Sequence, residues 1–293
     1  MDKHLLVTIS DDCQNLSGVK FLSSFFDKLS RHQLTLLHIC RIDNTEMEKE
    51  LLDMWQDPDR NGINALTPGG KRAITRARKI IRQSKMSIAS LKTKAVKEKY
   101  GKVKDILTEG SKGLYDAIVL GRRASYTLQW LFERPAEETP HAMIKDSCFT
   151  TPLWVCPEPD VDRRDVLVAI DGSEHSFRAV DHVGYMLSHQ KQHRITLLHL
   201  ENSAISDVRS LFQRADRILH EHGINDERIS HRSYWSISIP GAILTLTEQE
   251  KYAAVAVGQH GIERNKLKEY NLSGGTTAKL VARIEKTSLW CCP

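Results

Sequence analysis

The sequence has few cysteines, few aromatic residues and no long apolar run. Six cysteines occur in 293 residues, none at C-x-x-C spacing, which speaks against a disulfide framework and a zinc site and favours reduced thiols inside a cell. The longest apolar stretches, such as Ala253–Val257, have about five residues, whereas a membrane-spanning helix needs ~20. Asp11 and Asp12 stand where the apolar core of a signal peptide would continue. We therefore expect a cytoplasmic protein with no membrane insertion.

The rest of the composition is that of an ordinary globular chain. Hydrophobic residues make up 40% and charged residues 27%, which excludes collagen-like, low-complexity and wholly disordered chains. At about 100–200 residues per domain, 293 residues predict about two domains.

An internal repeat supports the two-domain prediction. At an offset of 161, residues 4–39 align without a gap with residues 165–200, and nine of the 36 positions are identical, including TLLH at 35–38 and 196–199. At an offset of 137, YDAIVLG at 115–121 meets YAAVAVG at 252–258. The first copy therefore carries about 24 extra residues, around positions 45–70. The sequence predicts domains over 1–157 and 160–293, joined at the stiff Pro157-Glu158-Pro159 stretch.

Within each copy, short apolar runs alternate with segments of helical periodicity, a pattern typical of βαβ units. For the second copy we expect five strands and four helices. The strands are placed at Val166–Ile170, Ile195–Leu200, Ile229–Ser236, Ala254–Val257 and Ser288–Cys292. The helices are placed at Ser176–Leu187, at Ile205–His220, from near Pro240 and from near Thr276. The fold class is thus α/β: two tandem, doubly wound, five-stranded parallel-sheet domains of Rossmann or flavodoxin-like type.

Candidate binding residues follow the strands of the second copy. Asp171 follows the first strand and can accept hydrogen bonds from a ribose or adenine edge, or help to hold a divalent cation. Gly258 and Gly261 follow the fourth strand and lack a Cβ, so the backbone there can approach a ligand or adopt positive φ. Gly275-Thr276-Thr277 opens the last helix, where free N–H groups and the helix dipole favour phosphate.

These motifs resemble the universal stress protein family, and the duplication resembles its tandem type. The resemblance rests on LVAIDGSEHS at 167–176, TLLHL at 196–200, and G-x-x-G followed by G-[ST]. It implies that the two domains pack as an intramolecular pseudo-dimer, with the strands of Trp154 and Trp290 paired at the middle. It implies an adenine nucleotide, ATP or AMP with or without Mg²⁺, bound in the second copy as part of a stress sensor or switch. Such a ligand would not be required for folding. By the same resemblance Ile170, Asp171 and the backbone of Leu200 would hold the nucleoside, and the phosphates would lie on Gly258, Gly261, Gly275, Thr276 and Thr277.

The second copy departs from the family pattern at one place. Thirteen residues, 262–274, separate Gly261 from Gly275 where the family has nine, so the longer loop either covers a nucleotide differently or obstructs it. The resemblance also allows slow ATP hydrolysis. No general base beyond Asp171 and no catalytic triad is visible, so we expect a binding protein and not an enzyme.

The first copy departs further. Ser10 stands at the position of Asp171, Ala124 at that of Gly261, and Thr139-Pro140 at that of Gly275-Thr276. Because proline has no N–H to donate, the amide cradle for phosphate is largely lost. We predict no family-type ATP site here. Arg122 and Arg123 either bind another anion or are solvated loop charges.

A basic segment, residues 71–104, supplies a second hypothesis. It holds thirteen lysines and arginines and one acidic residue, a local charge of +12 in a chain of +5. We predict a helix from Lys71 to about Ile88 that buries Ile74, Ala77, Ile81 and Ile88 and turns Arg72, Arg76 and Lys79 outward. The alternative function is therefore a scaffold that binds no nucleotide and recruits an acidic partner through this segment. Nucleic acid is less favoured because aromatic residues are not interleaved there. A homodimer is also compatible with the sequence.

Three other features are interpreted structurally. His38 and His199 close the second strand of each copy and are expected to bond the backbone beneath the strand ends. Cys156 and Cys292 occupy equivalent terminal strands and are expected to be buried. His189 and His193 have no third ligand, so we predict no metal site.

Overall fold

The computed structural model describes residues 2–27, 31–40, 66–121, 149–201, 207–259 and 276–293. The first half contains β1 (Lys3–Thr8), α1 (Ser17–Phe25), β2 (Arg31–Cys40), α3 (Pro68–Gln83), β3 (Ser87–Lys97), α4 (Lys102–Gly110), β4 (Ala117–Gly121) and β5 (Leu153–Cys156). The second half contains β6 (Val166–Ala169), α7 (Glu174–Leu187), β7 (Ile195–Glu201), α8 (Val208–Glu221), a 3₁₀ turn (Asp226–Arg228), β8 (Ile229–Trp235), α9 (Ile239–Gln249), β9 (Ala254–Gly258), α10 (Thr276–Arg283) and β10 (Ser288–Cys292). The five strands expected in the second half are confirmed, and its four helices lie at or close to their expected positions.

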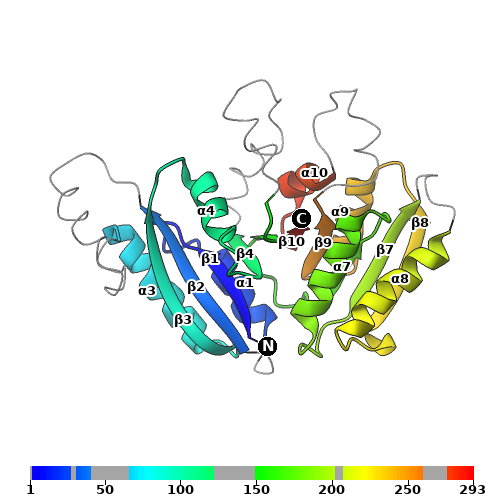
Figure 1. The fold of residues 1–293 in the computed structure, drawn as a ribbon, viewed down its shortest axis with the longest axis horizontal. Helices are drawn as coiled ribbons and strands as arrows, with labels where there is room; N and C mark the ends of the chain where they lie inside the picture. Colours follow the sequence, from blue (N-terminus) through cyan, green and yellow to red (C-terminus); the bar gives the residue numbers. More distant parts are fainter. Residues whose placement is uncertain (1, 28–30, 41–65, 122–148, 202–206, 260–275) are drawn as a thin grey trace, which may run out of the picture.

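The ten strands form one sheet in the order β3-β2-β1-β4-β5-β10-β9-β6-β7-β8. Every neighbouring pair is parallel except β5 and β10, which are antiparallel and place Trp154 opposite Trp290. Each half therefore contributes five strands in the same relative order, and the two blocks meet at the middle of the sheet (Figure 1). This confirms the α/β prediction and the expected pairing of the two tryptophan strands.

Helices cover both faces of the sheet. Apolar residues of α1, α3, α7 and α8 pack on one face, and those of α4, α9 and α10 pack on the other. Both strand faces are covered, which explains why the central strands have continuous apolar sequences instead of alternating ones. Cys156 and Cys292 are fully buried in this core, as expected.

The middle of the sheet is an aromatic core shared by the two halves. The Trp154 and Trp290 rings stack with their centroids 3.8 Å apart, and neither residue is exposed to solvent. Phe25 packs edge-on against Trp290 and stacks on His193. His182 of α7 accepts a hydrogen bond from Trp154 Nε1.

Lys3 adds a polar link between the halves. Its ammonium group donates to the carbonyl of Met186 and to Ser188 Oγ, at the carboxyl end of α7, where the helix dipole favours a cation. Burial lowers the pKa of this lysine to about 8.

The structure corrects the predicted helix in the basic segment. Helix α3 begins at Pro68, after the capping residue Thr67, and ends at Gln83; Ile88 lies in strand β3. The predicted burial of Ile74, Ala77 and Ile81 is confirmed. Ile88 packs against the same core from the strand, and its spacing of seven residues from Ile81 matches about two turns of an α-helix.

No helix among the described residues combines the length and the apolar character needed to cross a bilayer.

Candidate functional site

The carboxyl ends of β6, β7 and β9 lie at one edge of the sheet, because these three parallel strands are neighbours. Ile170 and Asp171 follow β6, Leu200 is near the end of β7, and Gly258 ends β9. Ile170 and Leu200 are buried, whereas Asp171 is partly exposed. In open α/β sheets this edge is where ligands bind.

Asp171 also shapes the start of α7. Its Oδ1 accepts hydrogen bonds from the backbone N–H of Ser173 at 3.0 Å and from the Ser173 hydroxyl at 2.6 Å. Ser173 in turn caps α7 by accepting from the N–H of Ser176. Gly172 between them has φ +83°, which L side chains rarely adopt. The DGS sequence thus forms a turn that holds a carboxylate beside a helix N-terminus.

Gly258 brings β9 into close contact with the same helix end. A Cβ at Gly258 would lie 2.7 Å from the carbonyl carbon of His175 and 2.9 Å from the nitrogen of Ser176. Its φ is not positive. We predicted that this glycine allows close approach of a ligand; in the described structure its backbone approaches the first turn of α7.

The start of α10 contacts this point as well. Thr277 is buried, and its hydroxyl donates to the carbonyl of Gly258 at 3.3 Å. The N–H of Gln259 donates to the carbonyl of Cys292 at 2.7 Å, and its side-chain oxygen is buried without a hydrogen-bond partner among the described residues. The N-termini of α7 and α10 therefore meet at the end of β9. Gln259 was not singled out from the sequence, since an isolated glutamine has no motif.

The strand-end histidines have the expected structural role. Nδ1 of His38 lies 2.8 Å from the carbonyl of Ile9, and Nδ1 of His199 lies 2.9 Å from that of Ile170. Both imidazoles are buried. In each half the histidine thus ties the end of the first strand to the second.

The first half differs at the equivalent edge. Thr67, the capping residue of α3, hydrogen-bonds the carboxylate of Asp11, and Asp11 lies 3.6 Å from Nε2 of His38. A Cβ at Gly70 would lie only 2.6 Å from that same nitrogen. The Gly-Gly start of α3 therefore rests directly on the strand ends of this half.

Several predicted residues lie outside the described part of the chain. They are Gly261, Gly275, Arg122 and Arg123, together with most of the 45–70 insertion. Within the described residues no group of three or more histidine, cysteine, aspartate or glutamate side chains could hold a metal ion.

The sheet order and the two helix N-termini at its carboxyl edge define a doubly wound α/β protein with Rossmann-like halves. Residues 162–289 match the model of the universal stress protein family, so this part of the chain is a universal stress protein domain. The family model does not extend over the first half. No curated protein gives a significant match to the chain.

Solved structures extend the fold similarity to both halves. A universal stress protein from Archaeoglobus fulgidus aligns with 99% of this chain and 95% of its own, at 13% identity and a TM-score of 0.60. A universal stress protein in complex with cAMP aligns with 44% of this chain and 95% of its own, at 21% identity and a TM-score of 0.35. One from Lactobacillus plantarum aligns with 44% of this chain and 97% of its own, at 14% identity and a TM-score of 0.31. At 13% identity, the Archaeoglobus fulgidus structure shows similarity of fold alone.

Replacement of Gly258 by alanine tests the packing of β9 on α7. The new methyl group would overlap backbone atoms, which cannot rotate away, so we expect a loss of about 1–3 kcal/mol in the free energy of unfolding, measured by urea denaturation. Gly121 is the matched control, since it ends β4 in the first half. The nearest atom to a Cβ there would be the Ser17 hydroxyl at 3.0 Å, which can turn, and the nearest backbone atom, the nitrogen of Gly18, would be at 4.0 Å. Equal losses for the two variants would contradict the proposed backbone contact.

Proposed function

We propose that residues 160–293 bind an adenine nucleotide, ATP or AMP with or without Mg²⁺, and act as a nucleotide-dependent sensor or switch in stress responses. One observation carries the proposal. In the universal stress protein domain, Asp171 and the first residues of α7 and α10 converge on the carboxyl ends of β6 and β9. We propose no catalytic role, although weak ATP hydrolysis is compatible with the family.

The chemistry of these groups suits the two parts of a nucleotide. Helix N-termini attract phosphate through their N–H groups and dipole, and Thr276 adds a hydroxyl at the start of α10. The Thr277 hydroxyl already donates to the carbonyl of Gly258, so Thr277 would contribute its backbone N–H. Asp171, held next to the end of β6, offers a carboxylate to the ribose or to an exocyclic amine. Ile170 and the Leu200 backbone would border the nucleoside. Gly261 and Gly275 would complete the phosphate site.

A switch would operate by population shift. A nucleotide bound at the start of α10 favours the conformations in which this helix is docked on β9. Helix α10 leads directly into β10, which pairs with β5 of the other half. Occupancy of the site would therefore bias an element that also contacts the middle of the molecule.

The first half is not expected to bind a nucleotide in the same way. Thr67 and Gly70 of α3 already contact Asp11 and His38 at its strand ends. A nucleoside would have to displace the first turn of a helix whose apolar face is buried. This steric argument supports a single nucleotide site per chain.

Two measurements test the proposal: calorimetric titration with ATP, with and without Mg²⁺, and thermal unfolding in the presence of ATP. A ligand at a concentration of about 100 times its dissociation constant stabilises the folded state by ~2.7 kcal/mol. The midpoint temperature of thermal unfolding should therefore rise by several degrees. Asp171→Ala should weaken binding by about tenfold or more, since hydrogen bonds to a charged group contribute ~1.5–3 kcal/mol. Ser10→Ala, at the equivalent position of the first half, should leave binding unchanged.

Asp171→Ala also removes an acceptor for Ser173, so the unfolding midpoint without nucleotide must be compared first. Absence of heat and of a thermal shift for the wild-type chain at millimolar ATP would refute the nucleotide proposal.

A further inference from the structure

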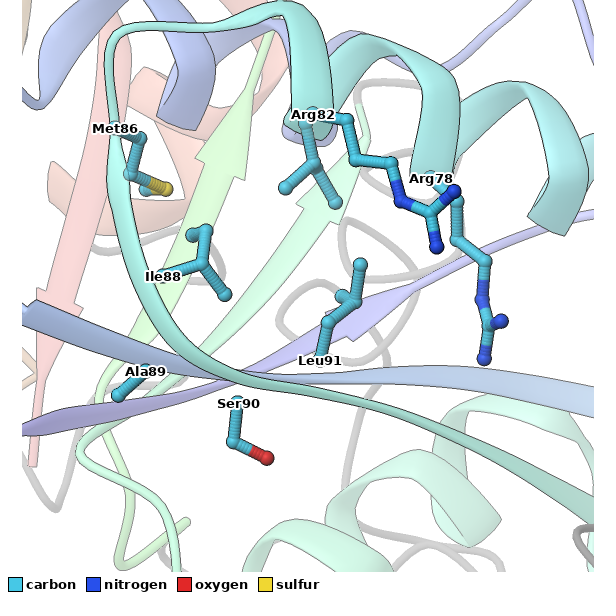
Figure 2. Close-up of a pocket in the computed structure, with 8 residues that line it drawn as sticks. Arg78, Arg82, Met86, Ile88, Ala89, Ser90 and Leu91 are labelled. Atoms are coloured by element: carbon cyan, nitrogen blue, oxygen red, sulfur yellow. The ribbon is translucent and has the colours of Figure 1, made fainter.

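A groove lies between the second half of α3 and the start of the edge strand β3 (Figure 2). It has a volume of about 400 Å³, within the range of small binding sites. Ile81, Met86, Ile88 and Leu91 form its apolar lining, and Arg78 and Arg82 extend from α3 beside them. Nothing in the proposed nucleotide site involves these residues.

A β-bulge produces the groove. His32 of β2 is opposite Ile88, but the next residue, Gln33, is opposite Ser90, so Ala89 is an extra residue in β3. Ile88 and Leu91 consequently both point toward α3, whereas Ala89 and Ser90 point to the other side of the strand (Figure 2). Bulges are common at sheet edges, where they redirect side chains.

The two arginines are suited to binding an anion. Arg82 is exposed, and Arg78 is partly buried and donates from Nη2 to Thr93 Oγ1 at 2.8 Å. The Nε of Arg78 is buried and has no hydrogen-bond acceptor among the described residues. Because this nitrogen is buried, a ligand carboxylate would instead pair with the exposed guanidinium of Arg82 and with the exposed part of Arg78.

Strand β3 is also open to pairing. It is the last strand of the sheet in the described part of the chain, with β2 as its neighbour on one side. Lys92 is exposed on β3, Arg72, Arg76 and Lys79 are exposed on α3, and Lys85 is exposed between the two elements. Lysines at a sheet edge discourage pairing with apolar or basic strands, but they favour an acidic one.

We propose that β3 and this groove bind an extended acidic peptide segment of another protein by strand addition. The peptide backbone would pair with the free edge of β3. An apolar side chain would enter the groove, and a neighbouring carboxylate would pair with Arg78 and Arg82. Grooves between a helix and an edge strand suit this mode of recognition, in which the backbone contributes affinity and the groove selects side chains. The inference is independent of nucleotide binding.

A peptide fits these features better than a nucleic acid. Single-stranded nucleic acids bind through aromatic stacking platforms, and the groove is lined by aliphatic side chains and methionine. The edge strand offers backbone hydrogen bonds that only an extended polypeptide can match in register.

Fluorescence anisotropy with the full-length chain tests the proposal. The probe is a labelled nine-residue peptide of alternating glutamate and valine, and the same peptide with N-methyl groups on alternate amides is the comparison. We expect N-methylation to weaken binding by about tenfold or more, because it removes backbone donors but keeps the charge. Arg78→Gln/Arg82→Gln should weaken binding of the unmodified peptide to a similar extent. Arg209→Gln/Arg217→Gln, two exposed arginines of α8, should not.

Thermal unfolding must show that the variants remain folded. Arg82→Gln alone changes an exposed residue and keeps the experiment informative if the double variant is unstable. Equal binding of the methylated and unmodified peptides, or tighter binding of a 20-nucleotide single strand through the same arginines, would overturn strand addition. A dimer detected by sedimentation and abolished by Arg82→Gln would also overturn it, because the groove would then hold a second copy.

Discussion

Replacement of Trp290 by alanine is expected to lower the free energy of unfolding by about 3–5 kcal/mol. Trp290 is completely buried, stacks on Trp154 at 3.8 Å, and donates from Nε1 to Ser288 Oγ at 3.2 Å. Its removal would leave a large cavity at the junction of β5 and β10, where both halves supply the surrounding atoms. The measurement is urea denaturation followed by circular dichroism, which does not depend on the fluorescence of the removed ring.

Trp235→Ala is the matched control for this experiment. Trp235 ends β8 and is 66% exposed, so its replacement should change stability by less than ~0.5 kcal/mol. Trp290→Phe should lose less than Trp290→Ala, because it keeps an aromatic ring against Trp154. If Trp290→Ala and Trp235→Ala cost the same, the two-tryptophan stack would not be a main source of stability.

Acidification should destabilise the protein strongly, with His182 as a principal cause. Burial lowers the pKa of His182 to about 3, and its Nε2 must stay unprotonated to accept from Trp154. In the unfolded chain this histidine takes up a proton near pH 6.5, whereas in the folded protein it does not. The contribution of His182 to the free energy of unfolding is therefore fully present above pH ~6.5. It falls by ~1.4 kcal/mol per pH unit as the pH drops toward 3. Burial also lowers the pKa values of His193 and His4, which adds to the trend.

Unfolding free energies at a series of pH values between 7 and 4.5 test this expectation. His182→Gln keeps an acceptor for Trp154 but does not titrate, so the loss of stability over this range should shrink by about 2–3 kcal/mol relative to wild type. His189→Gln changes an exposed histidine near the end of the same helix and should leave the pH dependence unchanged. An unaltered slope in His182→Gln would show that other groups cause acid unfolding.

Much of the fold could be predicted from the sequence because the repeat shows the same strand pattern in both copies of the domain. The match of TLLH in both copies placed β2 and β7, and the equivalent terminal strands of Cys156 and Cys292 placed β5 and β10. The basic segment was harder. Ile88 has the spacing of an apolar helical face but belongs to a bulged strand. Its side chain packs against the same core as the apolar face of α3. The spacing of apolar residues indicates which side chains are buried. It does not distinguish one long helix from a helix and a strand that pack on the same core.

The candidate site was predictable in part. The placement of Asp171 and Thr277 near the carboxyl edge of the sheet could be predicted, because Asp171 follows a predicted strand and Thr277 opens a predicted helix. The contact of Gly258 with α7 could not, because a glycine pattern does not say which atoms come near. The contact of Thr67 with Asp11 was equally hidden, since 56 residues separate them and the two copies differ there.

The sequence by itself determined the duplicated α/β organisation, the strand edge where a ligand would lie and the inequality of the two halves, because these depend on local periodicity and on residue types at strand ends. Only the tertiary structure decided which side chains meet where the halves join and what each strand edge contacts. The stack of Trp154 on Trp290, the helix start that rests on His38 and the groove beside β3 all depend on distances between segments far apart in the chain. Such distances follow from the packing of whole layers and are not recorded in any one segment.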